Sequence, residues 1–227
     1  MEWARFFEPY ELALQELKIN LRGIRKQYKT KGLHSPIEFV NARIKTIPSI
    51  LDKLETLGLD LTHIEEVYDI AGLRINCQFV EDIYMVVELL KNRQDLEIVE
   101  ERDYIINQRS SGYRSYHIHA LYHLETIDGI KKVMVEFQIR TLAMNFWAII
   151  EHSLNYKYDE QIPVEIKDRL KQAAEAATWL DSQMSAIRDE ISEAQKTFEM
   201  RQGENRKELE RPAPSLAEIL INQQKEE

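Results

Sequence analysis

Apolar residues near both ends of the chain recur alternately four and three positions apart. This heptad spacing lines them up on one helix face, so it predicts long helices over about residues 3–28 and 166–198. Pro9 suits a first helical turn, so we expect the regular helix to begin there, with the preceding residues packed separately or kinked. The first set is Trp3, Phe7, Tyr10, Leu14, Leu17, Leu21, Ile24 and Tyr28. The second set is Ile166, Leu170, Ala173, Ala177, Leu180, Met184, Ile187, Ile191, Ala194 and Phe198.

Two short helices are expected after the first long one. Residues 35–38 read SPIE, which has the form of a capping box with proline at the first helical position, and so predict a short helix through Phe39. Glu38 would then act as a cap. A second helix is expected over about residues 48–58, with Leu51 and Leu54 on its inner face.

The middle of the chain alternates apolar and polar residues, which is the pattern of β-strands. Helical spacing interrupts it once, over residues 83–90, and returns over residues 142–156. Asp128 and Gly129 suit the turn of a hairpin, and residues 103–114 form a polar loop. The expected strands cover residues 73–79, 96–100, 115–123 and 132–139.

Composition indicates a single globular domain. The chain has 227 residues, of which 44% are hydrophobic, enough for one well-buried core. We expect the domain to span residues 1–200 and a polar, flexible tail to follow over residues 201–227. A lone cysteine, Cys77, excludes a disulfide framework, and the sequence shows neither a signal peptide nor a membrane span. These features predict a cytoplasmic protein that does not associate with a membrane.

Charge is distributed unevenly along the chain. The net charge of −9 argues against bulk binding of duplex nucleic acid, which normally requires a basic excess. Between Lys18 and Lys53, however, nine lysines and arginines stand against two acids, Glu38 and Asp52. We therefore expect an anionic ligand at this segment.

Three expected strands place unusual polar residues on one face. In the last strand Glu136, Gln138 and Arg140 alternate with apolar residues, and Arg74 and His117 occupy matching positions on two other strands. Such a face can simply be solvated, as in half-exposed antiparallel sheets. Amides, histidine and arginine together instead favour recognition of planar or phosphorylated ligands, so the five side chains form a candidate concave binding surface.

Asp69 directly precedes the first of these strands, where it is either a turn aspartate or a ligand-binding carboxylate. Together with Glu136 it has the chemistry to hold one Mg²⁺, which takes few carboxylates and prefers phosphate oxygens. The sequence contains neither G-x-x-x-x-G-K-[ST] nor G-x-G-x-x-G, so phosphates must be held by side chains. Arg43, Lys45 and Lys53 are the cations available for this purpose. The sequence lacks the H-E-x-x-H motif, so a zinc site is not expected.

Several motifs in order resemble one family. The stretches SPIEF, RIKTIPSILDKL, YDIAGLRI, SGYRSYHI and VEFQIRTLAMNFWAIIEHSLNYKY resemble the small alarmone synthetases of the RelA/SpoT superfamily, most closely the RelQ group. The match runs from Trp3 to Phe198. It implies an α/β (α+β) fold, a nucleotidyltransferase-like synthetase domain whose mixed, mostly antiparallel sheet of about five strands is flanked by long N- and C-terminal helices.

The resemblance also implies an activity. Small alarmone synthetases transfer the β,γ-pyrophosphate of ATP to the 3′-hydroxyl of GTP or GDP, which yields AMP and pppGpp or ppGpp, the alarmones of the stringent response. Bifunctional members of the superfamily carry an additional hydrolase domain, which we do not expect in this chain. An alternative from a different class is a regulator with a silent active site that senses alarmone or binds single-stranded RNA, as the basic segment suggests.

Residue roles follow from the resemblance alone. It implies that Asp69 and Glu136 bind Mg²⁺ and that Glu136 acts as the catalytic base. The implied ATP-binding residues are Arg43, Lys45, Ser49, Lys53, Arg74 and Arg102. The implied GTP-binding residues are Arg109, Tyr113, His117, Gln138, Asn145 and Glu151.

The RelQ group further implies a homotetramer with a cleft between subunits that binds the alarmone product as an allosteric activator. The matching positions in this chain are Lys18, Arg22, Arg25, Glu38, Phe39 and Asn41. Independently of the resemblance, Lys18, Arg22, Arg25 and Lys29 follow one helical stripe beside the first heptad positions, as an anion site requires.

Overall fold

The computed structural model describes residues 2–157 and 163–209. The chain divides into two compact units, Met1–Met184 and Ser185–Glu227, of which the first contains the sheet. The helices are α1 (Trp3–Thr30), α2 (Ile47–Leu57), the 3₁₀ helix η1 (Leu61–Glu66), α3 (Val80–Lys91), α4 (Leu142–Lys157) and α5 (Val164–Leu209). The strands are β1 (Phe39–Ile44), β2 (Ala71–Cys77), β3 (Leu96–Asp103), β4 (Tyr116–Thr126) and β5 (Gly129–Thr141).

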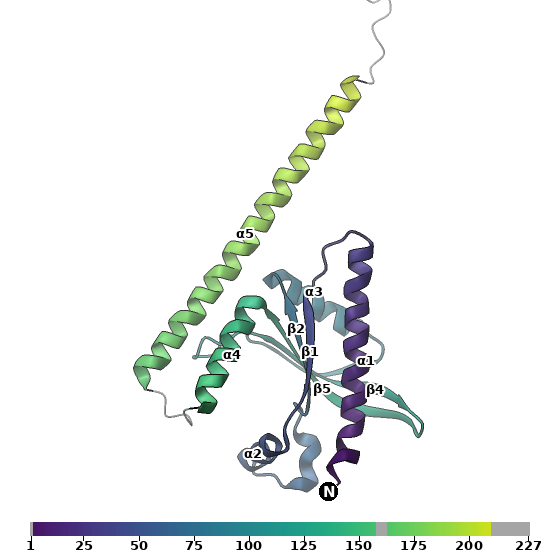
Figure 1. The fold of residues 1–227 in the computed structure, drawn as a ribbon, viewed down its shortest axis with the longest axis vertical. Helices are drawn as coiled ribbons and strands as arrows, with labels where there is room; N and C mark the ends of the chain where they lie inside the picture. The colour runs from purple at the N-terminus through teal and green to yellow at the C-terminus, as the bar shows by residue number, and fades with distance from the viewer. Residues whose placement is uncertain (1, 158–162, 210–227) are drawn as a thin grey trace, which may run out of the picture. The chain divides into compact units, whose positions relative to one another are not determined.

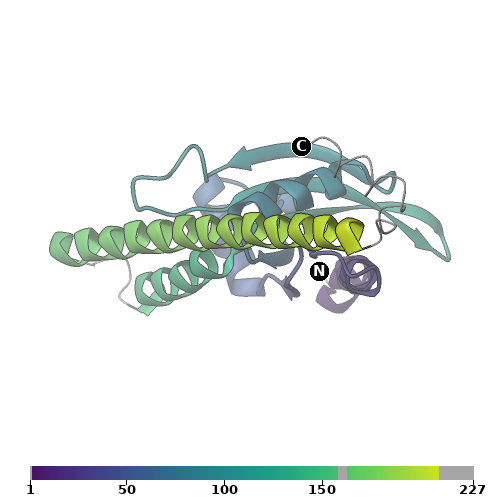
Figure 2. The same cartoon turned by 90° about the horizontal axis from the view of Figure 1, so that it is seen from above.

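The five strands form one mixed sheet in the order β1-β2-β5-β4-β3. Only β2 and β5 run parallel, and the other neighbours are antiparallel. The β4–β5 hairpin turns between Thr126 and Gly129, whose φ of 102° favours glycine. The hairpin turn and the loop between β3 and β4 lie at opposite ends of the sheet (Figure 2). This architecture confirms the α/β fold expected from the sequence.

One face of the sheet carries the main hydrophobic core. Phe137 and Ile139 of β5 and Ile75 of β2 are fully buried there beneath α1 and α3. Helix α1 contributes Leu17 and Leu21 from its heptad positions. Figure 1 shows α1 and α4 on opposite sides of the sheet. The polar residues of the strands therefore lie on the face of the sheet opposite α1.

A second, smaller core lies around α2 and η1. Trp3 and the aromatic residues that follow it pack against Ile50 and Leu54. The expectation that the first helix begins at Pro9 is wrong, because α1 starts at Trp3 and Pro9 lies inside it. Aromatic burial in this cluster outweighs the hydrogen bond that proline removes. The inner face of α2 is Ile50 and Leu54, whereas Leu51, which was expected there, is 42% exposed.

The short helix expected at residues 35–39 is also wrong. Residues 35–38 form no helix and bend at 36 and 38, and Phe39 begins the edge strand β1. Ser35 still folds back locally, since its hydroxyl accepts a hydrogen bond from the Ile37 amide at 3.3 Å. Glu38 caps no helix and instead pairs with Arg25 at 2.7 Å. Pairing with β2 starts at the end of this segment, where the Glu38 amide donates to the Asn76 carbonyl at 2.8 Å, and it prevails over the local capping signal.

Helix α5 extends farther than the sequence indicated. It continues to Leu209, so residues 201–209 of the expected tail are helical, and residues 210–227 lie outside the described range. Its first part belongs to the unit that holds the sheet. None of the described helices combines the length and apolar character that crossing a bilayer requires.

Candidate active site

Two rows of polar positions cross the sheet on the face opposite α1. Strand pairing sets each row, because residues directly opposite on neighbouring strands point to the same face. The first row is Arg43, Gly72, Glu136, His119 and Glu100. The second row is Asn41, Arg74, Gln138, His117 and Arg102.

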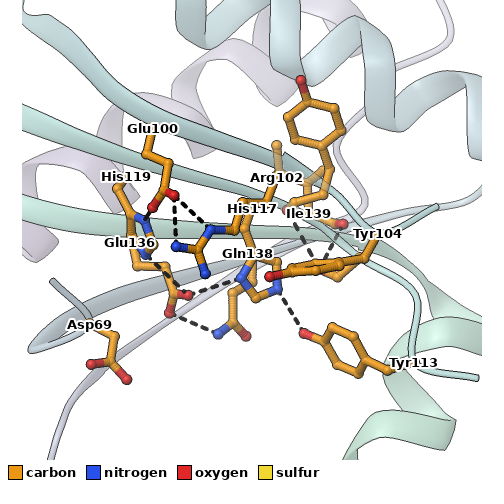
Figure 3. Close-up of polar contacts among 12 residues, drawn as sticks. Asp69, Glu100, Arg102, Tyr104, Tyr113, His117, His119, Glu136, Gln138 and Ile139 are labelled. Carbon is orange, nitrogen blue, oxygen red and sulfur yellow. Dashed lines mark hydrogen bonds and ion pairs between the residues drawn. The ribbon is translucent and has the colours of Figure 1, made fainter. Parts of the chain in front are cut away.

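Glu136 lies at the centre of the first row and is only 5% exposed. Its Oε1 atom is 3.1 Å from His117 Nδ1 and 3.6 Å from His119 Nε2, and Gln138 donates to Oε2 at 2.8 Å. Figure 3 shows these contacts converging on one carboxylate. Burial of this kind, matched by polar partners, is not that of a solvated sheet face.

The electrostatics of this group keep Glu136 ionised. Burial opposes ionisation, but hydrogen bonds and charge from His117 and His119 outweigh it and hold the pKa of Glu136 well below its ordinary value. The two histidines respond differently. Burial lowers the pKa of His117, whereas the contacts of His119 with Glu136 and Glu100 overcome burial and raise its pKa.

Asp69 projects from the turn before β2 on the same side of the sheet (Figure 3). Lys45 donates to its Oδ2 atom at 2.6 Å, and the two side chains are only 14% and 17% exposed. The other oxygen, Oδ1, is buried and has no hydrogen-bond partner among the described residues. A buried carboxylate oxygen without a partner is a free ligand position for a cation.

Asp69 and Glu136 fit a Mg²⁺ site in which the protein supplies only some of the ligands and the substrate supplies others. Among the described residues, no three histidines, cysteines or acids are grouped to hold a metal. Mg²⁺ does not need such a cage, since it is bound through one or two carboxylates, water and substrate phosphates. Asp69 and Glu136 meet that requirement when a phosphorylated ligand supplies the rest.

A cavity of about 520 Å³ lies beside Gln138, which also donates a hydrogen bond to Glu136. It is lined by Arg43, Arg74, Arg109, Ser111, Tyr113, Gln138, Arg140, Ala148, Ile149, Glu151 and His152. Four of these residues are arginines. Burial and the nearby charges of Arg140 and Arg43 lower the pKa of Arg74. Like charges gathered without an equal number of acids favour an anionic, planar ligand such as a nucleotide.

Tyr113 lines this cavity, and its hydroxyl is held in place. Its hydroxyl lies 2.7 Å from His117 Nε2 and accepts a hydrogen bond from Arg140. The Arg109 guanidinium lies 4.5 Å from the centre of the Tyr104 ring and 5.6 Å from that of Tyr113. This aromatic and cationic group is suited to stacking on a base.

The other residues assigned to ATP are only partly gathered. Arg43 and Arg74 share the cavity, and Lys45 contacts Asp69. Ser49 and Lys53 are exposed on the first turns of α2, where the Ser49 hydroxyl lies 2.8 Å from that of Thr46, the N-cap. The remaining one, Arg102, pairs with Glu100 at 2.7 Å at the far edge of the sheet.

Helix α4 carries the last two GTP candidates. Glu151 lines the cavity, and Asn145 lies nearly two turns earlier on the helix. Asn145 Oδ1 is buried without a hydrogen-bond partner among the described residues. An unsatisfied buried acceptor of this kind is suited to a ligand donor.

The six candidate allosteric residues do not form one site within a single chain. Arg25 of α1 pairs with Glu38, which also accepts from Gln78 at 3.0 Å. Asn41 instead lies on the opposite face of β1 and lines a small cavity with Arg74. The others are Lys18, half-buried on α1, and Arg22 and Phe39, which are exposed.

Sequence reasoning left several residues out of the site. Arg140 was placed on the polar face but given no role, although it contacts Tyr113, Gln138 and Ser115 at once. Glu100 was not considered, and it lies 3.0 Å from His119 Nδ1. Alternation alone already put His119 on the same face as His117, so this signal was present in the sequence.

Comparison with known proteins identifies the family and the fold. Residues 42–161 match the family model described as a region found in RelA / SpoT proteins. The chain belongs to the RelA/SpoT family. The matched region contains both carboxylates and every residue of the two polar rows except Asn41.

Small alarmone synthetases are among its relatives in this family. The GTP pyrophosphokinase YjbM of Bacillus subtilis (strain 168) is 55% identical over 197 residues, which cover 87% of this chain and 93% of that protein. The crystal structure of small alarmone synthetase 1 from Bacillus subtilis bound to its product pppGpp matches with a TM-score of 0.81 and 55% identity, covering 84% of this chain and 98% of that one. The same synthetase bound to AMPCPP matches with a TM-score of 0.76 and 52% identity, covering 85% and 98%.

Proposed function

We propose that this protein is a GTP pyrophosphokinase, which transfers the β,γ-pyrophosphate of ATP to the 3′-hydroxyl of GTP or GDP. The bond between the 3′ oxygen and the β-phosphorus forms as the bond from that phosphorus to the α,β-bridging oxygen breaks, and AMP leaves. The observation that carries the proposal is the buried, ionised Glu136 next to an arginine-lined cavity. The names of the relatives, a GTP pyrophosphokinase and a synthetase with pppGpp bound, agree with it.

Glu136 and Asp69 are the proposed Mg²⁺ ligands. Bound there, Mg²⁺ would neutralise phosphate charge and help align ATP for in-line attack. The chain's own part begins with Lys45, which holds Asp69 in place until a cation or phosphate competes for it. Because Glu136 stays ionised at neutral pH, no proton must leave it before the ligand binds.

Glu136 is also the proposed acceptor of the proton from the 3′-hydroxyl. A carboxylate with a strongly lowered pKa is a weak base, so its contacts with His117 and His119 matter. The proton, once taken up by Glu136, lies within the same hydrogen-bonded group as two imidazoles. A positioned base of this kind contributes about 10²–10⁴-fold to rate.

The two nucleotides would occupy opposite parts of the polar face. We assign ATP to the β1 and α2 side, with the adenine between Arg43 and Arg74 and the phosphates near Lys45, Ser49 and Lys53. Arg102 would have to reach these phosphates from β3, at the opposite edge of the sheet. We assign the guanine base to Tyr113, where stacking is worth about 1–3 kcal/mol. His117, Gln138, Asn145 and Glu151 complete this part, with Arg109 near the phosphates.

Product analysis tests the activity directly. Purified protein is incubated with ATP, GTP and Mg²⁺, and nucleotides are separated by anion exchange, alongside Glu136→Gln. We expect AMP and pppGpp in equal amounts from the wild type, and a loss of about 10²–10⁴-fold in the variant. ADP in place of AMP would contradict pyrophosphoryl transfer, and an active variant would contradict the role of Glu136.

The basic stripe on α1 supports a regulatory proposal. We propose a homotetramer in which residues that are separate in one chain, such as Arg25 and Asn41, meet across subunits and bind pppGpp or ppGpp as an activator. Added pppGpp should raise the initial rate, and Arg25→Gly should remove the increase. An unchanged wild-type rate would contradict this proposal.

The same stripe supports a second candidate, the binding of single-stranded RNA. Arg22 is exposed on α1 and Arg25 is half-buried one turn later, so both are placed to contact phosphates. Their replacement should abolish an RNA affinity that falls with rising salt. Salt-independent binding would argue against it, and RNA binding by a protein without turnover would favour the regulator over the enzyme.

A further inference from the structure

The loop between β3 and β4 carries Arg109 and Tyr113, the two residues assigned to GTP that lie outside regular structure. Its ends are joined by a hydrogen bond from the Tyr104 amide to the Ser115 carbonyl at 3.0 Å. Between them the chain turns sharply, with the Gly112 amide bonded to the Arg109 carbonyl at 2.9 Å. The Tyr113 amide donates to Ser111 Oγ at 3.4 Å, a long hydrogen bond that by itself fixes the position of Tyr113 only weakly.

Helix α5 supplies one fixed point directly before Tyr113. A Cβ atom added to Gly112 would lie 2.5 Å from Ala174 Cβ and 3.9 Å from the Lys171 backbone, so the loop backbone rests on the helix. The φ of Gly112 is +87°, which also favours glycine. Ala174 is 4% exposed and clusters with Trp147 and Tyr113.

A second fixed point follows directly after Tyr113. Arg114 Nη1 donates to Thr178 Oγ1 at 3.1 Å and to Asp181 Oδ2 at 3.3 Å, and the two charged side chains are 10% and 6% exposed. Asp181 also accepts from the Thr141 hydroxyl at 3.0 Å. Thr141 ends β5, so one carboxylate joins the loop, α5 and the sheet.

A buried ion pair is a costly way to achieve packing alone. Burial raises the pKa of Asp181 against the opposing effect of Thr141 and Arg114. Apolar residues of similar volume often stabilise such a position equally well. What the pair adds is direction, because it anchors the chain directly after Tyr113, as the Gly112 contact does directly before it, while the Tyr113 ring turns toward His117 and Arg140.

We propose that the Ala174 to Asp181 face of α5 is a platform that docks the β3–β4 loop, and that Arg114 and Asp181 are positioning residues for GTP. The proposal rests on the proposed function, since it deepens the assignment of GTP to Tyr113. Neither residue needs to touch the nucleotide. Their effect reaches it through Tyr113, the residue between Gly112 and Arg114.

The test measures GTP and ATP binding separately in Asp181→Asn. Isothermal titration calorimetry should show GTP affinity about tenfold weaker and ATP affinity within about twofold of the wild type, where tenfold corresponds to 1.4 kcal/mol. Hydrogen exchange of residues 104–115 should become faster. The control is Glu175→Gln, which changes an exposed carboxylate on the same helix. It should leave the two nucleotide affinities and the loop exchange unchanged. Equal losses for both nucleotides, or unchanged GTP affinity, would overturn the proposal.

The pair and the glycine contact provide independent checks. Arg114→Gln combined with Asp181→Asn should weaken GTP binding no more than the larger single change, because both act through one interaction. If Asp181→Asn does not fold, Gly112→Ala displaces the loop instead, because the added Cβ would meet Ala174 and the φ of +87° strains an alanine. It should weaken GTP binding more than ATP binding, and equal losses for both nucleotides would contradict the proposal.

These readouts do not depend on turnover. A wild type that binds GTP but makes no AMP would contradict the proposed activity. The docking platform would still be tested, because GTP affinity and hydrogen exchange of the loop can be measured without turnover. A wild type that makes AMP, with Asp181→Asn variants unaltered in GTP affinity and loop exchange, would contradict the platform alone.

Discussion

Alternate side chains of β5 point to opposite faces of the sheet and are buried almost equally, by different means. Phe137 and Ile139 are fully buried and packed under α1 and α3. On the other face Glu136 and Arg140 are 5% and 4% exposed, and their burial is matched by hydrogen bonds. The two faces are thus almost equally buried, but one is stabilised by apolar packing and the other by hydrogen bonds.

The difference teaches which changes each face tolerates. Packing is nondirectional, so the apolar face accepts other side chains of similar volume at modest cost. Hydrogen bonds are directional, and the loss of one partner leaves another polar group buried and unsatisfied. We therefore expect changes to the apolar face to alter stability alone, and changes to the polar face to alter substrate use as well.

The largest effect on stability should come from Phe137→Ala. Removing this fully buried ring leaves a cavity and should lower the free energy of unfolding by about 3–5 kcal/mol. Denaturant titration measures it, and Ile130→Ala, at a residue of β5 that is 69% exposed, is the control, with a change within about 0.5 kcal/mol. Nucleotide affinities of folded Phe137→Ala should match the wild type, and a selective loss of GTP binding would break the comparison.

Arg140→Lys should have a smaller effect on stability but extend to the substrate. A lysine cannot reproduce the hydrogen bonds that Arg140 makes to Ser115, Gln138 and Tyr113. The free energy of unfolding should therefore fall by about 1–3 kcal/mol. The kcat/KM for GTP should fall more than that for ATP. Steady-state kinetics with each nucleotide varied in turn decide this, and equal falls would place Arg140 among the merely structural residues.

The smallest expected effect is a pH dependence. The pKa of Glu136 is below its ordinary value of 4.5 in the folded protein, so its contribution to stability is complete above pH 4.5 and is lost as the pH falls through the lower folded value. In this pH range, Glu136→Gln should reduce the slope of the unfolding free energy plotted against pH. The reduction is at most about 1.4 kcal/mol per pH unit. Glu125→Gln, at an exposed position of β4, is the control. An unchanged slope would mean that Glu136 is not held in its ionised form.

Most of this sheet was predictable from local pattern, whereas the edge strand β1 was not. Alternation identified β2, β4 and β5 and the faces of Glu136, Gln138 and His117. Residues 39–44 also alternate, but the stronger capping signal just before them favoured a helix. Only pairing with β2 decides this segment, and pairing is a contact between residues distant in sequence.

The candidate site shows the same division. The motifs indicated that Asp69 and Glu136 act together, although the two residues are 67 positions apart in the chain. They could not indicate that Lys45 holds Asp69 or that Glu100 holds His119. Such partners depend on strand register, which a sequence specifies only through the whole sheet.

Helices α1 and α5 carry the same heptad spacing and use it differently. In α1 the apolar positions Leu14, Leu17 and Leu21 are buried against the sheet. In α5 the apolar positions Leu180 and Met184 are 44% and 43% exposed, and a neighbouring face of small and polar residues contacts the fold. Periodicity belongs to the local chain, so the sequence by itself determined that both segments are helical and which positions share a face. The partner of each face depends on long-range packing, and only the tertiary structure decided it.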